Sequence, residues 1–327
     1  MVDRIEIAKK FIQEQIRKRD DIVGAIVIGS VSRGEEVEPS DIDISLIVEG
    51  HQRGGVDTWQ DGVYIDAKTV LKGDYEDLEE ILQNPFRATH INDGLILYDP
   101  TGFFTRMQKE LRVVFMEPKW VGMRVQFWLE RTRKNMSGLQ ESVEVRDPLG
   151  ICENVEGILW GFTSVPLLRL GITPTSTRGL VRLGKTSDKL KESICEWEGS
   201  SKMHGDDVLA LLSLVLGGVS FMDTSKWGIL PTEYIVKKIE WMAKNDQHRE
   251  ALHVLWIGMG VHAVEWRKRE DAWIKSKGSE LAQRWLEGVG WDGKVALEEK
   301  LMMAKALLKK IEALAENLPS AGPPTSI

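Results

Sequence analysis

The chain has 327 residues, of which 42% are hydrophobic and 28% charged, a composition typical of a globular protein with room for two domains. It contains no run of about 18 apolar residues, which argues against a membrane span, and its charged N-terminus lacks the apolar core of a signal peptide. The two cysteines, Cys152 and Cys195, exclude a disulfide framework and a cysteine-rich zinc site. We therefore expect a reducing, cytoplasmic location.

Charge is unevenly distributed along the chain. Residues 1–100 contain 11 Lys/Arg and 21 Asp/Glu, a net charge of −10, whereas the remaining 227 residues have a net charge of +3. Such an acidic first domain argues against nonspecific binding of duplex nucleic acid, which requires a basic surface. It suits a site that collects divalent cations.

The first hundred residues alternate between helical and extended patterns. Apolar residues at helical spacing predict an amphipathic helix over 4–19. Short apolar or alternating segments predict strands at 21–29, 41–49, 62–70 and 93–99. Gly54-Gly55 indicates a hairpin loop over 51–61, and 75–84 is predicted to be helical. Asp99-Pro100 is predicted to start the next helix.

Beyond about residue 118 the pattern becomes helical. The segments with helical periodicity are 118–137, 149–170, 204–222, 231–244, 248–276 and 293–317, with SKGSE (276–280) interpreted as a helix break. Eleven of the twelve tryptophans lie from Trp120 to Trp291, and we interpret them mainly as the core of a helical bundle. We expect domains at 1–115 and 116–317 and a disordered, Pro-rich tail at 318–327.

Two acids interrupt the apolar strand predicted at 41–49. Residues i and i+2 of a strand face the same side, so Asp41 and Asp43 project together. Carboxylates held so close repel each other unless a cation lies between them. Mg²⁺ is the obvious candidate, because it often binds a few carboxylates together with substrate phosphates. If the strand at 62–70 pairs with this one as a hairpin, Asp66 reaches the same face.

The preceding segment, GSVSRG (29–34), has the features of an anion site. Backbone N–H groups at a strand-to-helix turn form a cradle for phosphate, and Gly29 allows a close approach. Ser30 and Ser32 add hydroxyl donors, and Arg33 adds a permanent positive charge. An anion cradle beside a three-acid metal site suits a nucleoside triphosphate with its Mg²⁺.

At these residues the chain resembles the DNA polymerase β-like nucleotidyltransferase superfamily, over roughly residues 20–105. The shared pattern consists of Gly29-Ser30, Arg33-Gly34, Ser40-Asp41-Ile42-Asp43 and the later acid Asp66. The resemblance implies an α+β fold: an N-terminal mixed sheet with flanking helices, followed by an all-α helical bundle. This layout is similar to that of the aminoglycoside and lincosamide nucleotidyltransferases.

The resemblance also implies a reaction. Asp41 and Asp43 would bridge two Mg²⁺ ions, Asp66 would hold the ion that activates an acceptor hydroxyl, and Ser40 would join Gly29, Ser30, Ser32 and Arg33 at the nucleotide. A nucleoside monophosphate, AMP from ATP as first guess, would pass to a small-molecule hydroxyl with release of pyrophosphate. We expect the acceptor to bind across a cleft facing helix 149–170, with Glu153 or Glu156 as proton acceptor.

Other interpretations remain open at this stage. Asp41 and Asp43 could be solvated residues at a strand start, Asp66 could lie on an exposed hairpin face, and Arg33 could pair with nearby glutamates. Glu153 and Glu156 could belong to a solvated helix face. The enzyme could instead modify a protein, as adenylylating antitoxins do, or the chain could bind nucleotide without catalysis. The acceptor, the preferred base and the oligomeric state cannot be read from the sequence.

Overall fold

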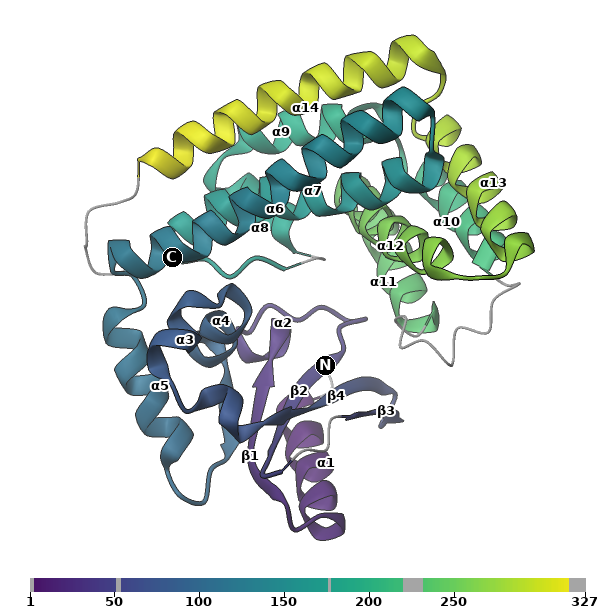
Figure 1. The fold of residues 1–327 in the computed structure, drawn as a ribbon. Helices are drawn as coiled ribbons and strands as arrows, with labels where there is room; N and C mark the ends of the chain where they lie inside the picture. Colours follow the sequence, from purple (N-terminus) through teal and green to yellow (C-terminus); the bar gives the residue numbers. More distant parts are fainter. Residues whose placement is uncertain (1–2, 51–53, 176–177, 220–231, 318–327) are drawn as a thin grey trace. The chain divides into compact units, whose positions relative to one another are not determined.

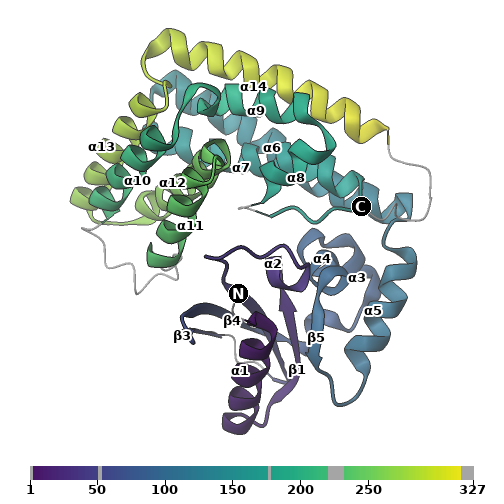
Figure 2. The ribbon, with the colours of Figure 1, turned by 180° about the vertical axis from the view of Figure 1, so that it is seen from behind.

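The structure, a computed structural model, describes residues 3–50, 54–175, 178–219 and 232–317. It divides into two compact units, Met1–Arg124 and Val125–Pro319 (Figures 1 and 2). The tail 318–327, which we expected to be disordered, lies outside the described residues. No helix in the described ranges is long and apolar enough to cross a membrane.

The N-terminal unit is built on a mixed sheet. In its described residues the strands are β1 (Ile22–Ile28), β2 (Ile42–Val48), β3 (Gly54–Gln60), β4 (Val63–Leu71) and β5 (Leu95–Tyr98). Their order across the sheet is β3-β4-β2-β1-β5. The pair β2–β4 is parallel, and the other neighbouring pairs are antiparallel.

The segment 51–61, predicted as a hairpin loop between two paired strands, is where the prediction fails. Residues Gly54–Gln60 form the edge strand β3, and the tight turn lies after it, at Asp61-Gly62. Both turn residues have positive φ, 51° and 78°, as a two-residue hairpin turn requires. Strand β3 therefore lies at the sheet edge, and β4 lies between β3 and β2. Because β4 is antiparallel to β3, it runs parallel to β2 and does not form a hairpin with it.

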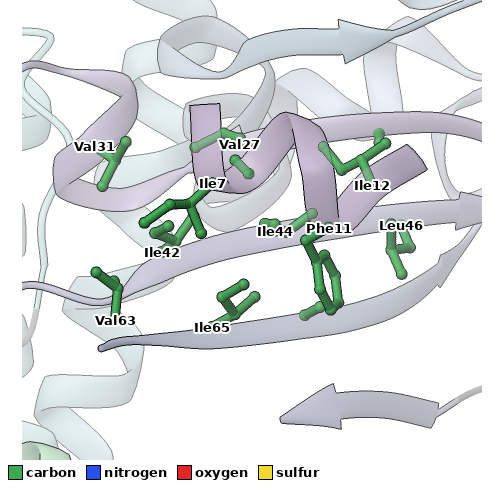
Figure 3. Packing of buried hydrophobic residues seen from close by; sticks show 13 residues of the cluster. Ile7, Phe11, Ile12, Val27, Val31, Ile42, Ile44, Leu46, Val63 and Ile65 are labelled. Carbon is green, nitrogen blue, oxygen red and sulfur yellow. The ribbon is translucent and has the colours of Figure 1, made fainter. Parts of the chain in front are cut away.

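One face of the sheet carries the first apolar core. Helix α1 (Arg4–Lys18) packs Ile7, Phe11 and Ile12 against this face (Figure 3). The strand residues that meet it alternate along the sequence, Ile42, Ile44 and Leu46 on β2 and Val63, Ile65 and Ala67 on β4. Because alternate strand residues face opposite sides, Asp41, Asp43 and Asp66 belong to the other face.

The opposite face is covered only in part. Helices α3 (Leu78–Gln83), α4 (Pro85–Asp93) and α5 (Phe103–Val114) pack a second apolar core on its β1 and β2 residues, including Ile26 and Ile47. The short α2 (Gly29–Ser32) follows β1, and a 3₁₀ turn, η1 (Lys72–Tyr75), follows β4. The remainder of this face, on β2, β4 and β3, is where the acids lie.

Two helix starts in this unit differ from the prediction. Helix α3 begins only at Leu78, because the Asp77 side chain caps it by accepting from Glu79 N and Glu80 N. Helix α5 begins at Phe103, three residues beyond the predicted start, although Asp99 still accepts a hydrogen bond from Thr105 N at 2.9 Å. Helix α4, capped by Asn84, was not predicted.

The second unit is helical in all its described residues that have regular structure. Its helices are α6 (Pro118–Val145, which begins in the first unit), α7 (Pro148–Arg169), α8 (Gly179–Thr186), α9 (Asp188–Glu198), η2 (Ser200–Lys202), α10 (Gly205–Val219), α11 (Thr232–Lys244), α12 (His248–Lys268), α13 (Ala272–Gly288) and α14 (Gly293–Glu316). The predicted α+β fold, a mixed sheet followed by a helical bundle, is confirmed.

The single helix predicted over 248–276 is two helices. Helix α12 ends at Lys268, and α13 starts after Asp271, whose side chain accepts from Trp273 N at 2.8 Å. The predicted break at 276–280 is wrong, because it lies inside α13. A Cβ on Gly278 would come within 2.7 Å of the Trp266 ring, so this glycine permits close packing of two helices.

Tryptophans form much of the core of the helical unit, as predicted. The described tryptophans that are buried from Val125 onward are Trp128, Trp197, Trp256, Trp266, Trp285 and Trp291. Trp291 contacts both Trp197 and Trp256, with ring centroids 5.4 Å and 5.2 Å apart. The indole N–H groups of Trp197, Trp256 and Trp291 donate to backbone oxygens, for example from Trp256 to Glu198 at 2.9 Å.

Candidate active site

A row of three carboxylates crosses the free part of the sheet. Asp43 on β2 is paired in register with Asp66 on β4, and Asp66 is paired with Asp57 on β3. Partners in register on neighbouring strands face the same side, so the three acids form one line across three strands. Asp41 lies two residues before Asp43 on this face and is buried. The parallel pairing of β2 with β4 therefore brings acids together that are 23 residues apart.

Gly29 lies against Asp43 at the end of β1. A Cβ built on Gly29 would lie 1.9 Å from Asp43 Oδ2, far inside any permitted contact. Gly29 also has φ +75°, a conformation that L side chains rarely adopt. The turn into α2 thus requires glycine twice, once for its backbone and once for the carboxylate beside it. The backbone of this turn and the first acid are held in direct contact.

The segment before Asp41 is fixed by hydrogen bonds. Ser40 is buried, and its hydroxyl accepts a hydrogen bond from Val37 N at 2.8 Å. Ser40 N in turn donates to Val37 O at 2.9 Å, which closes a tight turn. The Ser40 side chain, which we expected at the nucleotide, is therefore engaged in shaping the loop that leads into β2.

Asp66 has one engaged oxygen and one without a donor. Its Oδ2 lies 3.2 Å from Lys68 Nζ, an ammonium whose side chain is 72% exposed. Its Oδ1 is buried and, among the described residues, receives no hydrogen bond. A buried carboxylate oxygen without a donor is costly, and in native structures it calls for an explanation such as an ion.

These carboxylates fit a divalent cation by their chemistry. Carboxylate oxygens are the ligands that Mg²⁺ prefers, and the orphaned Oδ1 of Asp66 supplies an unused one. In the described part of the chain, no three His, Cys, Asp or Glu side chains already converge closely enough to hold one ion.

The comparisons with known proteins concern this region. Residues 8–135, which include all of the acids above, match the family model of the nucleotidyltransferase domain. This part of the chain is similar to that family. The match confirms the resemblance predicted from Gly29-Ser30 and Asp41-Ile42-Asp43.

The chain was also compared with solved structures and with curated proteins. A solved nucleotidyltransferase-like protein from Exiguobacterium sibiricum 255-15 is similar at 14% sequence identity and a TM-score of 0.36, over 82% of this chain and 81% of that one. No curated protein matches the chain.

Two of the residues predicted to bind the nucleotide, Ser32 and Arg33, are engaged with protein groups. The Ser32 hydroxyl donates to Gly29 O at 3.1 Å. The Arg33 guanidinium lies 3.2 Å from Glu35 Oε2 and 3.9 Å from Asp93 Oδ2, and is largely buried. Ser30 O accepts from Arg33 N and from Glu35 N, which closes the turn after Gly29. These contacts hold the turn in shape.

Residues that the sequence interpretation did not identify also lie on or near this face. Asp57 falls in the segment taken as a loop, and the alternation in VDTWQ (56–60) was the signal for its strand. Desolvation of its carboxylate and the negative charge of Asp66 raise the pKa of Asp57. Burial raises the pKa of Tyr64, whose charged neighbours are Asp57 and Asp66. Burial and the positive charge of Arg33 lower the pKa of His90 to about 4.

The two glutamates proposed as proton acceptors lie on α7, in the helical unit. Glu153 is ion-paired with Arg267, whose Nη1 lies 2.7 Å from Glu153 Oε2. Glu156 packs against Gly260 of α12, where a Cβ would approach the Glu156 side chain to 2.1 Å. Burial raises the pKa of Glu156 to about 7, although the nearby Arg131 charge opposes the shift. Of the two, Glu156 has the chemistry of a base near neutral pH.

Proposed function

We propose that this protein transfers a nucleoside monophosphate, AMP from ATP, to a hydroxyl group of a small-molecule acceptor. In this reaction the acceptor oxygen bonds to the α-phosphorus while the bond from that phosphorus to the bridging oxygen of the β-phosphate breaks. Pyrophosphate leaves with the electron pair, and the hydroxyl proton passes to a carboxylate. The observation that carries the proposal is the register pairing of Asp43 with Asp66 beside Gly29, inside the region that matches the nucleotidyltransferase family.

Asp41, Asp43 and Asp66 are the residues that would hold the divalent ions, which we propose to be two Mg²⁺. Bound Mg²⁺ supplies positive charge that stabilises the charge developing on the phosphoryl oxygens. The protein's part is to hold the carboxylates in a fixed arrangement. It does so by placing them on adjacent strands, with the buried residues Ile42 and Ile65 anchoring the same strands from the other face.

Gly29, Ser30 and Arg33 are proposed to bind the triphosphate. The positive φ of Gly29 directs the backbone around the end of β1 without a side chain in the way, which suits a close approach of phosphate. Arg33 is held near the turn by Glu35 and Asp93, so it is oriented before the nucleotide arrives. Exchange of these carboxylate partners for phosphate oxygens would keep its charge compensated.

The experiment that tests the proposal follows the fate of the nucleotide. The full chain is incubated with Mg²⁺ and ATP labelled at the α-phosphate, alone and with a panel of aminoglycosides and other polyhydroxylated small molecules. Release of pyrophosphate together with a labelled small-molecule product supports the proposal. Label that appears on a protein instead supports a protein-modifying adenylyltransferase. Nucleotide binding without turnover under every condition would support a catalytically silent protein.

A further inference from the structure

A buried arginine, Arg4, contacts the loop that leads into β2. Arg4 is the first residue of α1 and is only 5% exposed. Arginine is seldom buried to this extent unless its donors are satisfied. The hydrogen bonds that Arg4 donates in this structure all go to backbone carbonyl oxygens of one loop, the turn that precedes β2.

The geometry of these bonds is specific. Arg4 Nε donates to Ser40 O at 3.1 Å, and Arg4 Nη2 donates to Val37 O at 3.1 Å and to Glu38 O at 2.6 Å. Three carbonyls of a four-residue turn thus converge on one guanidinium. Helix α1 is itself fixed on the sheet by Ile7, Phe11 and Ile12, so the guanidinium is a rigid reference point.

We propose that Arg4 is a positioning residue for the metal site, which acts by fixing the peptide that joins Ser40 to Asp41. The peptide unit is planar, so holding Ser40 O in place also fixes the Asp41 N and Cα at the other end of that plane. The carboxyl carbon of Asp41 is two bonds beyond this fixed Cα. The inference rests on the proposed function, because it assumes that Asp41 is a metal ligand.

Arginine suits this role better than lysine would. Its planar, charged fork presents several N–H donors in fixed directions, whereas a lysine ammonium is a single flexible point charge. A lysine at position 4 could satisfy some of the three carbonyls but could not hold all three in one plane. Arginine and lysine carry the same charge, but at position 4 we expect only arginine to hold the loop fully.

The test compares metal binding and turnover in the full-length protein. Mn²⁺ binding is followed by electron paramagnetic resonance, alone and with an ATP analogue that carries a methylene bridge between the α- and β-phosphates. Loss of groups that orient metal ligands typically costs about 10–100-fold in metal affinity or activity. We expect Arg4→Met to weaken Mn²⁺ binding about tenfold and to lower kcat about 10–100-fold, with Arg4→Lys intermediate.

Arg17→Met is the matched control, since Arg17 is an exposed residue in the last turn of the same helix. It should bind Mn²⁺ and turn over as the wild type does. Thermal unfolding shows whether each variant is folded at the assay temperature, and Arg4→Lys serves if Arg4→Met is not. A purely structural role would lower the melting temperature and leave the Mn²⁺ affinity of the folded variants unchanged, which would overturn the inference. Wild-type protein that binds no Mn²⁺ would overturn the proposed function itself.

Discussion

Buried acids are treated differently in the two units of this protein. In the helical unit Glu198 is fully buried, and both its carboxylate oxygens have partners: Ser200 Oγ donates to one at 2.8 Å, and His253 Nδ1 lies 2.8 Å from the other. In the N-terminal unit Asp66 Oδ1 is buried without a donor. All the buried carboxylate oxygens without a donor in the described ranges belong to residues 36–99.

The difference distinguishes Glu198, which is satisfied within the protein, from Asp66, which we propose to bind a metal ion. A buried polar group that contributes to folding is satisfied within the protein, as Glu198 is. A buried oxygen left without a partner lowers the stability of the fold and is retained where something else binds it. Asp66, Asp43 and Asp57 also lie in one row, where their charges repel each other. The row of acids in the N-terminal unit therefore costs stability, whereas Glu198 in the helical unit contributes to it.

The largest expected effect compares one acid from each unit. Asp43→Asn should lower turnover by at least about 10²–10³-fold, as losing one preorganised electrostatic group does, and should leave thermal stability equal or higher because a like charge is removed. Glu198→Ala should instead lower thermal stability and leave the turnover of the folded protein unchanged. It leaves Ser200 and His253 without their buried partner, so it should cost about 2–5 kcal/mol of the free energy of unfolding.

Both variants are measured by turnover per folded molecule and by thermal unfolding. Glu198→Gln keeps one hydrogen-bonding oxygen and serves if the alanine variant does not fold. The contrast between the two acids would be contradicted if Asp43→Asn destabilised the protein while retaining activity, or if folded Glu198→Ala lost turnover.

Glu156 tests whether the helical unit also contributes to chemistry. Its folded pKa of about 7 lies above its ordinary value of 4.5. If it accepts the acceptor proton, kcat should rise with pH up to about 7, and Glu156→Gln should lower kcat about 10²–10⁴-fold and abolish this dependence. Glu312, a partly exposed acid of α14 that pairs with Arg133, provides the control, and Glu312→Gln should change neither. A wild-type pH profile in the glutamine variant would remove Glu156 from the reaction.

Glu156 makes a second prediction that does not depend on activity. The folded protein keeps the Glu156 proton to higher pH than the unfolded chain, so its contribution to stability is present below pH 4.5 and is lost as pH rises through about 7. Glu156→Gln should therefore unfold at the wild-type temperature at pH 4 and at a higher temperature at pH 8. Equal unfolding temperatures at both pH values would mean that the carboxylate is not buried as the structure has it.

Gly29→Ala tests the contact between the turn after β1 and Asp43, a proposed metal ligand. The new Cβ would displace Asp43 Oδ2, and a misplacement of about 1 Å can cost about 10²-fold in rate. Gly62→Ala is a close control, since Gly62 has φ +78° and no atom within 4 Å of its Cβ position. Both variants should lose about 1–2 kcal/mol from the left-handed backbone, and only Gly29→Ala should lose turnover. Equal turnover in the two variants would separate Gly29 from the site.

The limits of sequence interpretation follow the same division between the two units. The strand β1 was predictable as a short, continuous apolar run, and β2 and β4 because buried residues alternate with polar ones over part of each strand. The edge strand β3 was not, since it has no fully buried residue and begins with two glycines, which indicate a loop. Because the chain forms β3 between β2 and β4, these two strands run parallel. Their pairing thus depends on the path of the chain. In the helical unit, Gly278 looked like a break because packing against Trp266 leaves no mark in the local sequence.

The smallest expected effect concerns Lys68, the cation that neutralises Asp66 in this structure. Its ammonium lies 3.2 Å from Asp66 Oδ2, but the side chain is 72% exposed, and such surface pairs contribute about 0–1 kcal/mol. A divalent ion at Asp66 competes with this weak contact. Lys68→Met should therefore strengthen Mn²⁺ binding by about two- to fivefold, and the gain should shrink at high salt because an exposed charge is screened. Lys72→Met is the control, because Lys72 pairs with Glu49 at 2.7 Å and does not contact the row of acids. Weaker Mn²⁺ binding in Lys68→Met would show that Lys68 supports the site instead of competing for it, and would place this lysine with the nucleotide-binding residues.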